Sequence, residues 1–184
     1  ASSNADTVPR AETGLGFDEA LAKASAGGGV LRVFERTDFN APMASGSARM
    51  AGLVICPCST GTLGRIANGT SEDLVTRAAD VCLKEKRRLV LVVRETPLHK
   101  GHLEMMARAV DLGAHMLPPM PAFYNAPQTI DDLVNHSVGR ILDLFDLDAG
   151  ILRRWEGPPD RMKRTQKESD GKANAKPVAS IPAE

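Results

Sequence analysis

The sequence has no excess of charge of either sign and no long hydrophobic run, and each absence excludes a class of protein. Its 23 lysines and arginines balance its 23 aspartates and glutamates, which removes the long-range attraction that nucleic acid or an anionic membrane would exert. No apolar run approaches the roughly 20 residues that span a bilayer. The first residues also lack the basic-then-apolar pattern of a signal peptide. We therefore expect a cytoplasmic protein with no nucleic-acid or membrane partner.

Cysteine is also scarce, and its three residues are Cys56, Cys58 and Cys82. An odd number of cysteines in a chain of 184 residues does not fit a disulfide scaffold, because a chain of this length can bury a sufficient core without cross-links. We interpret all three as free thiols in a reducing compartment.

What the sequence does contain is an alternation of apolar and amphipathic segments. Strands are predicted at residues 30–34, 53–56, 88–95 and 114–119. Helices are predicted at 73–87, at 96–113, where Gly113 ends the helix, and at 127–147, where Thr129 is the N-cap. This order predicts an α/β protein with a doubly wound parallel sheet, in which ligands bind at the carboxyl ends of strands.

The predicted domain covers residues 1–156. From 157 to 184 large apolar residues become rare while lysine, proline, alanine and serine are common. Such a segment cannot bury enough apolar surface to offset the entropy of ordering, so we predict a disordered tail.

Two polar segments follow predicted strands. Ser59, Thr60, Gly61 and Thr62 stand where a strand gives way to a helix, a position suited to a phosphate or the polar edge of a ring. A serine cap without a ligand is the alternative. Arg94 and Glu95 follow the most apolar strand, where they would contact a ligand or form a surface ion pair.

Three further residues are candidates for contacts with a ligand. Arg77 and Lys84 are seven positions apart on one predicted helix, and therefore share a face. They would either bind one anion together or form a solvated basic face. Tyr124, the one tyrosine of the chain, lies in the proline-rich segment "PPMPAFYNAP", which would hold it over a cleft or pack it within the loop.

No pattern in the sequence predicts a metal site. Asp131 and Asp132 fall in the first turn of a predicted helix, where the helix dipole already favours acidic residues. The pair Cys56 and Cys58 lacks a second pair to complete a zinc site. His99 and His102 lack the spacing of a metalloprotease motif.

Several strings together closely resemble one family, the UbiX-type flavin prenyltransferases. They are "ASGS", "VICPCSTGTL", "RAADVCLKEKRRLVLVVRETPLHKGHLEMM", "LPPMPAFY" and "PQTIDDLVNHSVGRILDL", and the resemblance runs from about Glu12 to Trp155. It implies a flavodoxin-like Rossmann fold that binds FMN, assembled as a homododecamer. Members have also been called aromatic acid decarboxylases.

The resemblance implies a metal-independent transfer of a dimethylallyl group from dimethylallyl monophosphate to N5 and C6 of reduced FMN. The prenylated FMN would serve a UbiD-type decarboxylase. Several fixed cations and a phenol can stabilise a departing phosphate without a metal, and a dry pocket would hold the allyl group.

The resemblance also implies roles for individual residues. The residues that match FMN contacts are Ser2, Ser59, Thr60, Gly61, Thr62 and Arg94. Glu95 and Glu12 match acidic groups near the flavin, and Arg77 and Lys84 match the phosphate cluster. Tyr124 and Arg140 match positions that hold the prenyl phosphate, and Phe39 is a looser match near the allyl group.

One part of the family pattern is missing. Nothing in residues 1–30 matches the first strand and its glycine-rich G-x-S-G-A turn, so we expect the sheet to lack its first strand–helix unit. Two alternatives follow. One is an FMN-dependent decarboxylase of the cysteine-decarboxylase type, although the histidine that those enzymes place in their first half is absent here. The other is a flavin-binding protein without catalysis.

Overall fold

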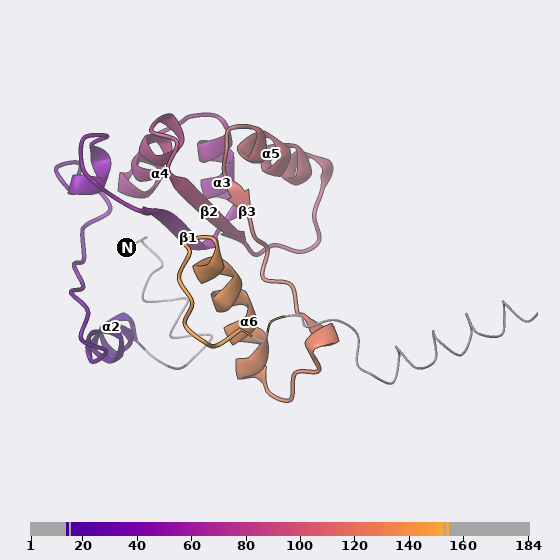
Figure 1. The fold of residues 1–184 in the computed structure, drawn as a ribbon. Helices are drawn as coiled ribbons and strands as arrows, with labels where there is room; N and C mark the ends of the chain where they lie inside the picture. Colours follow the sequence, from indigo (N-terminus) through magenta and orange to yellow (C-terminus); the bar gives the residue numbers. More distant parts are fainter. Residues whose placement is uncertain (1–13, 15, 153, 155–184) are drawn as a thin grey trace, which may run out of the picture. The chain divides into compact units, whose positions relative to one another are not determined.

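The computed structural model describes residues 14, 16–152 and 154, and the first of the two compact units of the chain ends at Leu152. The strands of this unit are β1 (Gly52–Cys58), β2 (Arg88–Val93) and β3 (His115–Met116), all parallel and in the order β1-β2-β3. Its helices are α2 (Phe17–Ser25), α3 (Thr60–Ala67), α4 (Leu74–Lys84), α5 (Lys100–Asp111) and α6 (Ile130–Asp143), with short 3-10 turns η1 (Pro42–Ala44) and η2 (Phe123–Asn125). The predicted α/β class with a parallel sheet is confirmed (Figure 1).

Strand β2 is the centre of the core. Its residues from Leu89 to Val93 are all buried, as expected for a parallel strand that has a neighbour on each side and helices against its face. The surrounding cluster includes Ile55, Cys58, Leu63, Cys82 and Ala109. The strand predicted at 88–95 therefore forms, but ends at Val93, which leaves Arg94 and Glu95 beyond its carboxyl end.

Strand β1 is longer than predicted and contains a bulge. Ile55 pairs with Leu91 and Cys58 pairs with Val93, so β1 has one more residue than β2 between these pairs. Pro57 lies within that interval, and a proline has no N–H to contribute to a strand ladder. Because β1 resumes at Cys58, the strand leads directly into Ser59.

The helices begin where side chains cap them. The Thr129 side chain accepts the N–H of Asp132 at 3.1 Å, so the predicted cap of α6 is confirmed. Asp73 caps α4 and His99 caps α5 in the same way. The predicted helices at 73–87, 96–113 and 127–147 are therefore correct in kind, and each is shorter than predicted.

The predicted strand at residues 30–34 is wrong. Val30, Leu31 and Val33 are exposed and no strand is assigned to them. Their β-favouring side chains do not suffice, because a strand needs a partner for its backbone and a face to bury. Helix α2, which the sequence pattern did not predict, precedes them, and Glu19 accepts the N–H of Gly16 at 3.0 Å at its start.

The described helices lie on both sides of the sheet. Helices α3, α4 and α5 contact its strands and one another, whereas Figure 1 shows α6 on the side away from them. The segment after α6 returns to β1 at Gly52. A Cβ there would lie 2.3 Å from the Arg88 carbonyl oxygen and 2.8 Å from Phe145 Cε1, so only glycine fits at this position.

Candidate functional site

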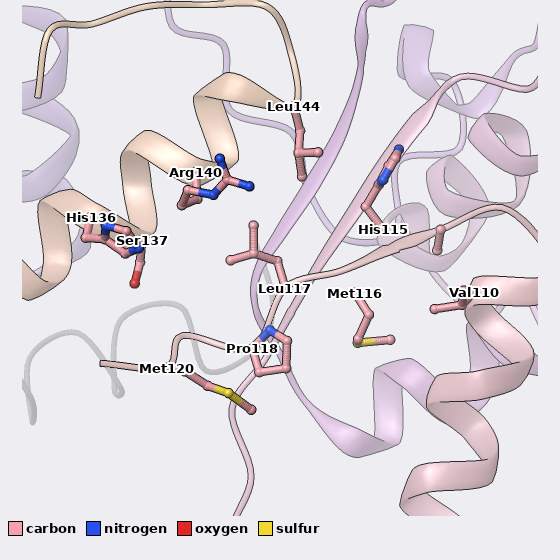
Figure 2. A pocket seen from close by; sticks show the side chains of 11 residues that line it. Val110, His115, Met116, Leu117, Pro118, Met120, His136, Ser137, Arg140 and Leu144 are labelled. Atoms are coloured by element: carbon pink, nitrogen blue, oxygen red, sulfur yellow. The ribbon is translucent and has the colours of Figure 1, made fainter. Parts of the chain in front are cut away.

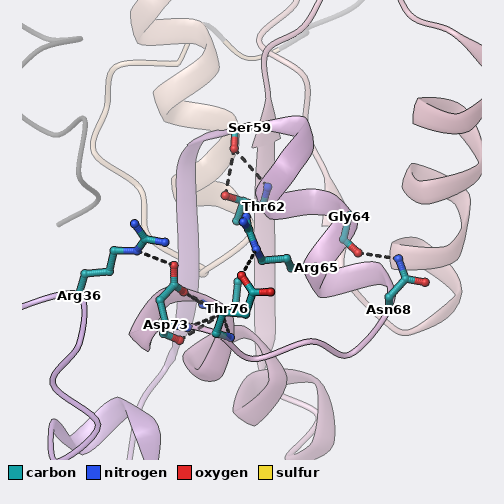
Figure 3. Close-up of polar contacts among 9 residues, drawn as sticks. Arg36, Ser59, Thr62, Gly64, Arg65, Asn68, Asp73 and Thr76 are labelled. Atoms are coloured by element: carbon teal, nitrogen blue, oxygen red, sulfur yellow. Dashed lines mark hydrogen bonds and ion pairs between the residues drawn. The ribbon is translucent and has the colours of Figure 1, made fainter.

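Residues 59–62, expected where a strand gives way to a helix, form the cap and first turn of helix α3. The Ser59 hydroxyl accepts the N–H of Thr62 at 3.2 Å and shares a hydrogen bond of 3.0 Å with the Thr62 hydroxyl (Figure 3). The serine cap that the sequence allowed is therefore present, and it lets the helix begin at Thr60. The first turn of a helix directs backbone N–H groups outward, which suits an anion or a polar ring edge.

Glu95 lies beside this helix start. Its Oε2 accepts a long hydrogen bond from the Thr60 hydroxyl at 3.5 Å, and its Oε1 accepts the N–H of Thr96 at 3.1 Å. Thr60 follows β1 and Glu95 follows β2, so the carboxyl ends of the two neighbouring strands bring these side chains together. Arg94 precedes Glu95 and is exposed at the same end of the sheet.

The cysteines next to this site are not reactive groups. All three are free thiols, as predicted. Burial raises the pKa of the Cys58 thiol to about 12, and also raises the pKa of Cys56 and Cys82, so each remains protonated at neutral pH. The Cys58 thiol donates to the Ser59 carbonyl at 3.6 Å, which makes it a packing residue beneath the start of α3.

The predicted cations of α4 contact protein groups. Arg77 donates from Nε to the Ala44 carbonyl at 3.1 Å and pairs with Asp80 at 2.9 Å. Lys84 pairs with Glu85, and its hydrogen bond and positive charge hold the pKa of the Glu85 carboxyl below its usual value. A bound phosphate would therefore compete with carboxylates for both cations.

The segment between Arg36 and Gly46 lies along α4, and two arginines that no sequence motif singled out attach it. Arg36 pairs through Nε with Asp73 at 2.9 Å, and its carbonyl accepts the N–H of Leu74 at 2.8 Å (Figure 3). Arg87 donates to the Gly46 carbonyl. Neither arginine could be found from a pattern, because both contacts join segments far apart in sequence. Phe39 lies in this segment and is 49% exposed.

Arg140 lies at a cavity of about 460 Å³ between α5, β3 and α6 (Figure 2). Its apolar lining residues are Val110, Ala114, Met116, Leu117, Pro118, Met120 and Leu144, and its polar ones are His115, His136, Ser137 and Arg140. Arg140 also pairs with Asp143 at 3.1 Å. A cavity with an apolar interior and an arginine in its wall suits a small amphiphilic anion.

Tyr124 lies next to this cavity on η2 and is 75% exposed. Its ring meets the His136 ring edge-on, with 6.0 Å between the ring centres. Because His136 lines the cavity, it connects the two residues predicted to hold the prenyl phosphate, Tyr124 and Arg140. Sequence reasoning missed His136, although it stands one helical turn before Arg140 on the same predicted helix.

The predicted site residues thus fall into three places in the chain. At the first place, a hydrogen bond joins Thr60 to Glu95. At the second, Arg77 and Lys84 lie along α4. At the third, Tyr124 and Arg140 lie at the α6 cavity. Ser2, Glu12 and the tail at 157–184 lie outside the described residues.

Within the described part of the chain, no three histidine, cysteine, aspartate or glutamate side chains are grouped as a metal site would require. Nor does any helix there have the length and apolarity to cross a membrane.

The chain matches a family and several curated proteins over much of its length. The model of the family described as Flavoprotein matches residues 4–142. A flavin prenyltransferase UbiX from Thauera aromatica is 53% identical over 129 residues, which are 70% of this chain and 66% of that protein. A probable UbiX-like flavin prenyltransferase from Streptomyces sp. (strain D7) is 52% identical over 153 residues, 83% of this chain and 74% of that protein. The chain spans about two thirds of the length of such relatives.

Solved structures agree with these matches. A crystal structure of AnUbiX (PadA1) in complex with FMN and dimethylallyl pyrophosphate has a TM-score of 0.79 and 44% identity, covering 86% of this chain and 81% of that one. A dodecameric FMN-dependent UbiX-like decarboxylase from Escherichia coli O157:H7 has a TM-score of 0.78 and 44% identity, covering 85% and 81%. The flavodoxin-like Rossmann fold is thereby confirmed, and the chain belongs to the flavoprotein family, in its UbiX-type branch.

Proposed function

We propose that this protein is a flavin prenyltransferase, which joins a dimethylallyl group from dimethylallyl monophosphate to N5 and C6 of reduced FMN. The observation that supports it most is the meeting of the α3 start with Glu95 at the carboxyl ends of β1 and β2. This is where an α/β sheet binds ligands. The similarity to a structure that holds both FMN and dimethylallyl pyrophosphate supports the same assignment.

The residues at the start of α3 fit a flavin. Gly61 leaves room above the first turn, since a Cβ there would meet only Arg65 Nη1 at 3.7 Å and Ser59 Oγ at 4.0 Å. Backbone N–H groups and the hydroxyls of Ser59, Thr60 and Thr62 would hold polar edges of the ring. Reduced FMN supplies the electron-rich nitrogen that accepts the allyl group.

The remaining residues would act on the phosphate and on protons. Arg77, Lys84, Arg140 and the Tyr124 phenol would stabilise the negative charge of the departing phosphate, which replaces the role of a metal. Glu95 would give a proton to the dimethylallyl double bond and take up the proton that C6 of the flavin loses as the second bond forms, and Glu12 is proposed as a second acidic group. Ser2 and Arg94 are proposed FMN contacts, and Phe39 is proposed to lie against the allyl group.

We also propose that the protein forms a homo-oligomer, a dodecamer, and passes prenylated FMN to a UbiD-type decarboxylase. A dodecameric structure 44% identical to this chain supports the assembly. Three free thiols support the cytoplasmic, reducing location expected from the sequence.

Anaerobic incubation with reduced FMN and dimethylallyl monophosphate, followed by mass spectrometry of the flavin, tests the function. The proposal expects a flavin enlarged by one five-carbon unit. Recovery of unmodified FMN would contradict the proposal and leave the two alternative functions given above. A second assay distinguishes between them. Release of carbon dioxide from a cysteine-derived carboxylate would identify a decarboxylase, and its absence a flavin-binding protein without catalysis.

A further inference from the structure

We infer that His136 is a positioning residue, which holds the Tyr124 ring at the mouth of the α6 cavity so that the phenol and Arg140 address the same phosphate. The inference rests on the proposed function, since it names a further residue of the proposed phosphate site. The ligand of this site would be a small phosphate monoester that carries a short apolar group.

His136 contacts η2 through two neighbouring residues. The Asn125 side-chain amide nitrogen and His136 Nδ1 form a hydrogen bond of 3.0 Å. The Tyr124 ring meets the same imidazole edge-on at an angle of 88°. Because Tyr124 is 75% exposed, few other contacts fix its ring, so the contact with His136 determines much of its orientation.

The position of His136 on α6 links Tyr124 to Arg140. Residues four positions apart on a helix lie on one face, so His136 and Arg140 are neighbours one turn apart, and both line the cavity (Figure 2). Helix α6 is itself fixed at its start, where Asp132 accepts the N–H groups of Gln128 at 2.8 Å and Thr129 at 2.9 Å. A displacement of η2 relative to α6 would therefore separate the phenol from the guanidinium.

The cavity matches the two parts of the expected ligand. His136, Ser137 and Arg140 of α6 give one wall polar groups, whereas Met116 and Leu117, on β3 and just after it, are apolar. A phosphate would face the α6 side and a five-carbon group would face the apolar residues.

The chain offers a spectroscopic test, because Tyr124 is its one tyrosine. A protein labelled only in tyrosine gives the nuclear magnetic resonance signals of this ring alone. The variant His136→Leu should shift these signals and weaken binding of dimethylallyl monophosphate roughly five- to tenfold, the effect of one hydrogen bond and a ring contact. His136→Asn, which keeps a hydrogen-bonding group for Asn125 but has no ring, should restore only the part of the affinity that the hydrogen bond supplies.

Two further variants serve as controls. His115→Leu alters the same cavity from β3 and should leave the Tyr124 signals unchanged. Arg140→Ala should weaken monophosphate binding because it removes a direct contact with the phosphate. It should not shift the Tyr124 signals to the positions that they take in His136→Leu. In steady-state assays His136→Leu should raise KM for the monophosphate, while kcat and the Kd of FMN stay close to those of the unaltered protein. General unfolding would instead change all three quantities.

Unchanged Tyr124 signals in His136→Leu, or an equal shift of these signals in His115→Leu, would overturn the inference. Absence of monophosphate binding to the unaltered protein would overturn it as well. These results are separate from a failure of the proposed function, which is the recovery of unmodified FMN, because the ring signals and the monophosphate titration require neither flavin nor turnover.

Discussion

Glu95 is the residue on which the proposed chemistry depends most. Its two carboxylate oxygens accept hydrogen bonds from Thr60 and Thr96, which fix the side chain at the carboxyl end of β2. Glu95→Gln keeps the shape of the side chain and removes its capacity to take a proton. We predict that FMN binding persists and that turnover falls by about 10²- to 10⁴-fold, the contribution of a positioned acid or base. Flavin fluorescence and the rate of prenylated flavin formation measure the two effects.

Glu104→Gln is a suitable control for this variant. Glu104 is a glutamate of α5 whose ion pair with Lys100, at 3.3 Å, lies on the surface. Its substitution should change neither measurement. If Glu95→Gln behaves like Glu104→Gln, Glu95 takes no part in the reaction.

At the scale of elements, Asp73 holds both the start of α4 and the segment before it. Burial raises the pKa of its carboxyl, but hydrogen bonds from Thr76 and the ion pair with Arg36 outweigh burial and hold the pKa below its usual value. A lowered pKa in the folded protein contributes stability above the pKa of the unfolded chain, and this stability is lost as pH falls through the folded value. Acid should therefore loosen α4.

The corresponding prediction concerns Asp73→Asn. The free energy of unfolding of the unaltered protein should fall as pH is lowered through and below the ordinary range of aspartate, and the fall should be smaller in the variant. At neutral pH the variant should be less stable by up to about 1 kcal/mol, the value of the ion pair with Arg36, because asparagine still caps the helix. Denaturant titrations at several pH values measure this. Parallel pH profiles in the two proteins would show that Asp73 does not stabilise α4 through its charge.

Elements were predictable where local sequence and tertiary environment agree. The run from Leu89 to Val93 is buried throughout, and Thr129 caps α6, so β2 and α6 follow from composition and capping. The segment 30–34 has the composition of a strand, but its side chains are exposed and it forms none. The bulge at Pro57 depends on the register with β2, which a single segment does not encode.

The candidate site was predictable in part, for a related reason. Thr60 and Glu95 could be placed together because both follow parallel strands. The contacts of Arg36, Arg87 and His136 join segments far apart in the chain or side chains of different elements, and they become visible only in three dimensions. The role of Arg140 came from the family resemblance, and those of Arg77 and Lys84 came from their shared helix face as well as from the resemblance; all three remain predictions.

At the scale of the whole molecule, assembly is the property that the described surface makes testable. Met120, Phe123 and Ile130 are each more than two thirds exposed at 71%, 71% and 79%, and they lie on η2 and the segments beside it. Clustered exposed apolar residues are typical of contact surfaces. Light scattering should give the mass of the proposed dodecamer, twelve times the 19.6 kDa of one chain. A mass of one chain at micromolar concentration would contradict the proposed assembly.

The central claim is that the carboxyl ends of β1 and β2 form a flavin site, and Gly61→Ala tests it most directly. In the protein without flavin an alanine fits at position 61, because its Cβ would have its nearest contact at 3.7 Å. Alanine is also favoured over glycine in a helix by up to about 1 kcal/mol. The same methyl group would occupy the space proposed for FMN. Quenching of flavin fluorescence should show FMN affinity reduced about tenfold or more, the equivalent of roughly 1.4 kcal/mol, with no loss of thermal stability. Equal FMN affinity in Gly61→Ala and the unaltered protein would contradict the placement of the flavin at this site.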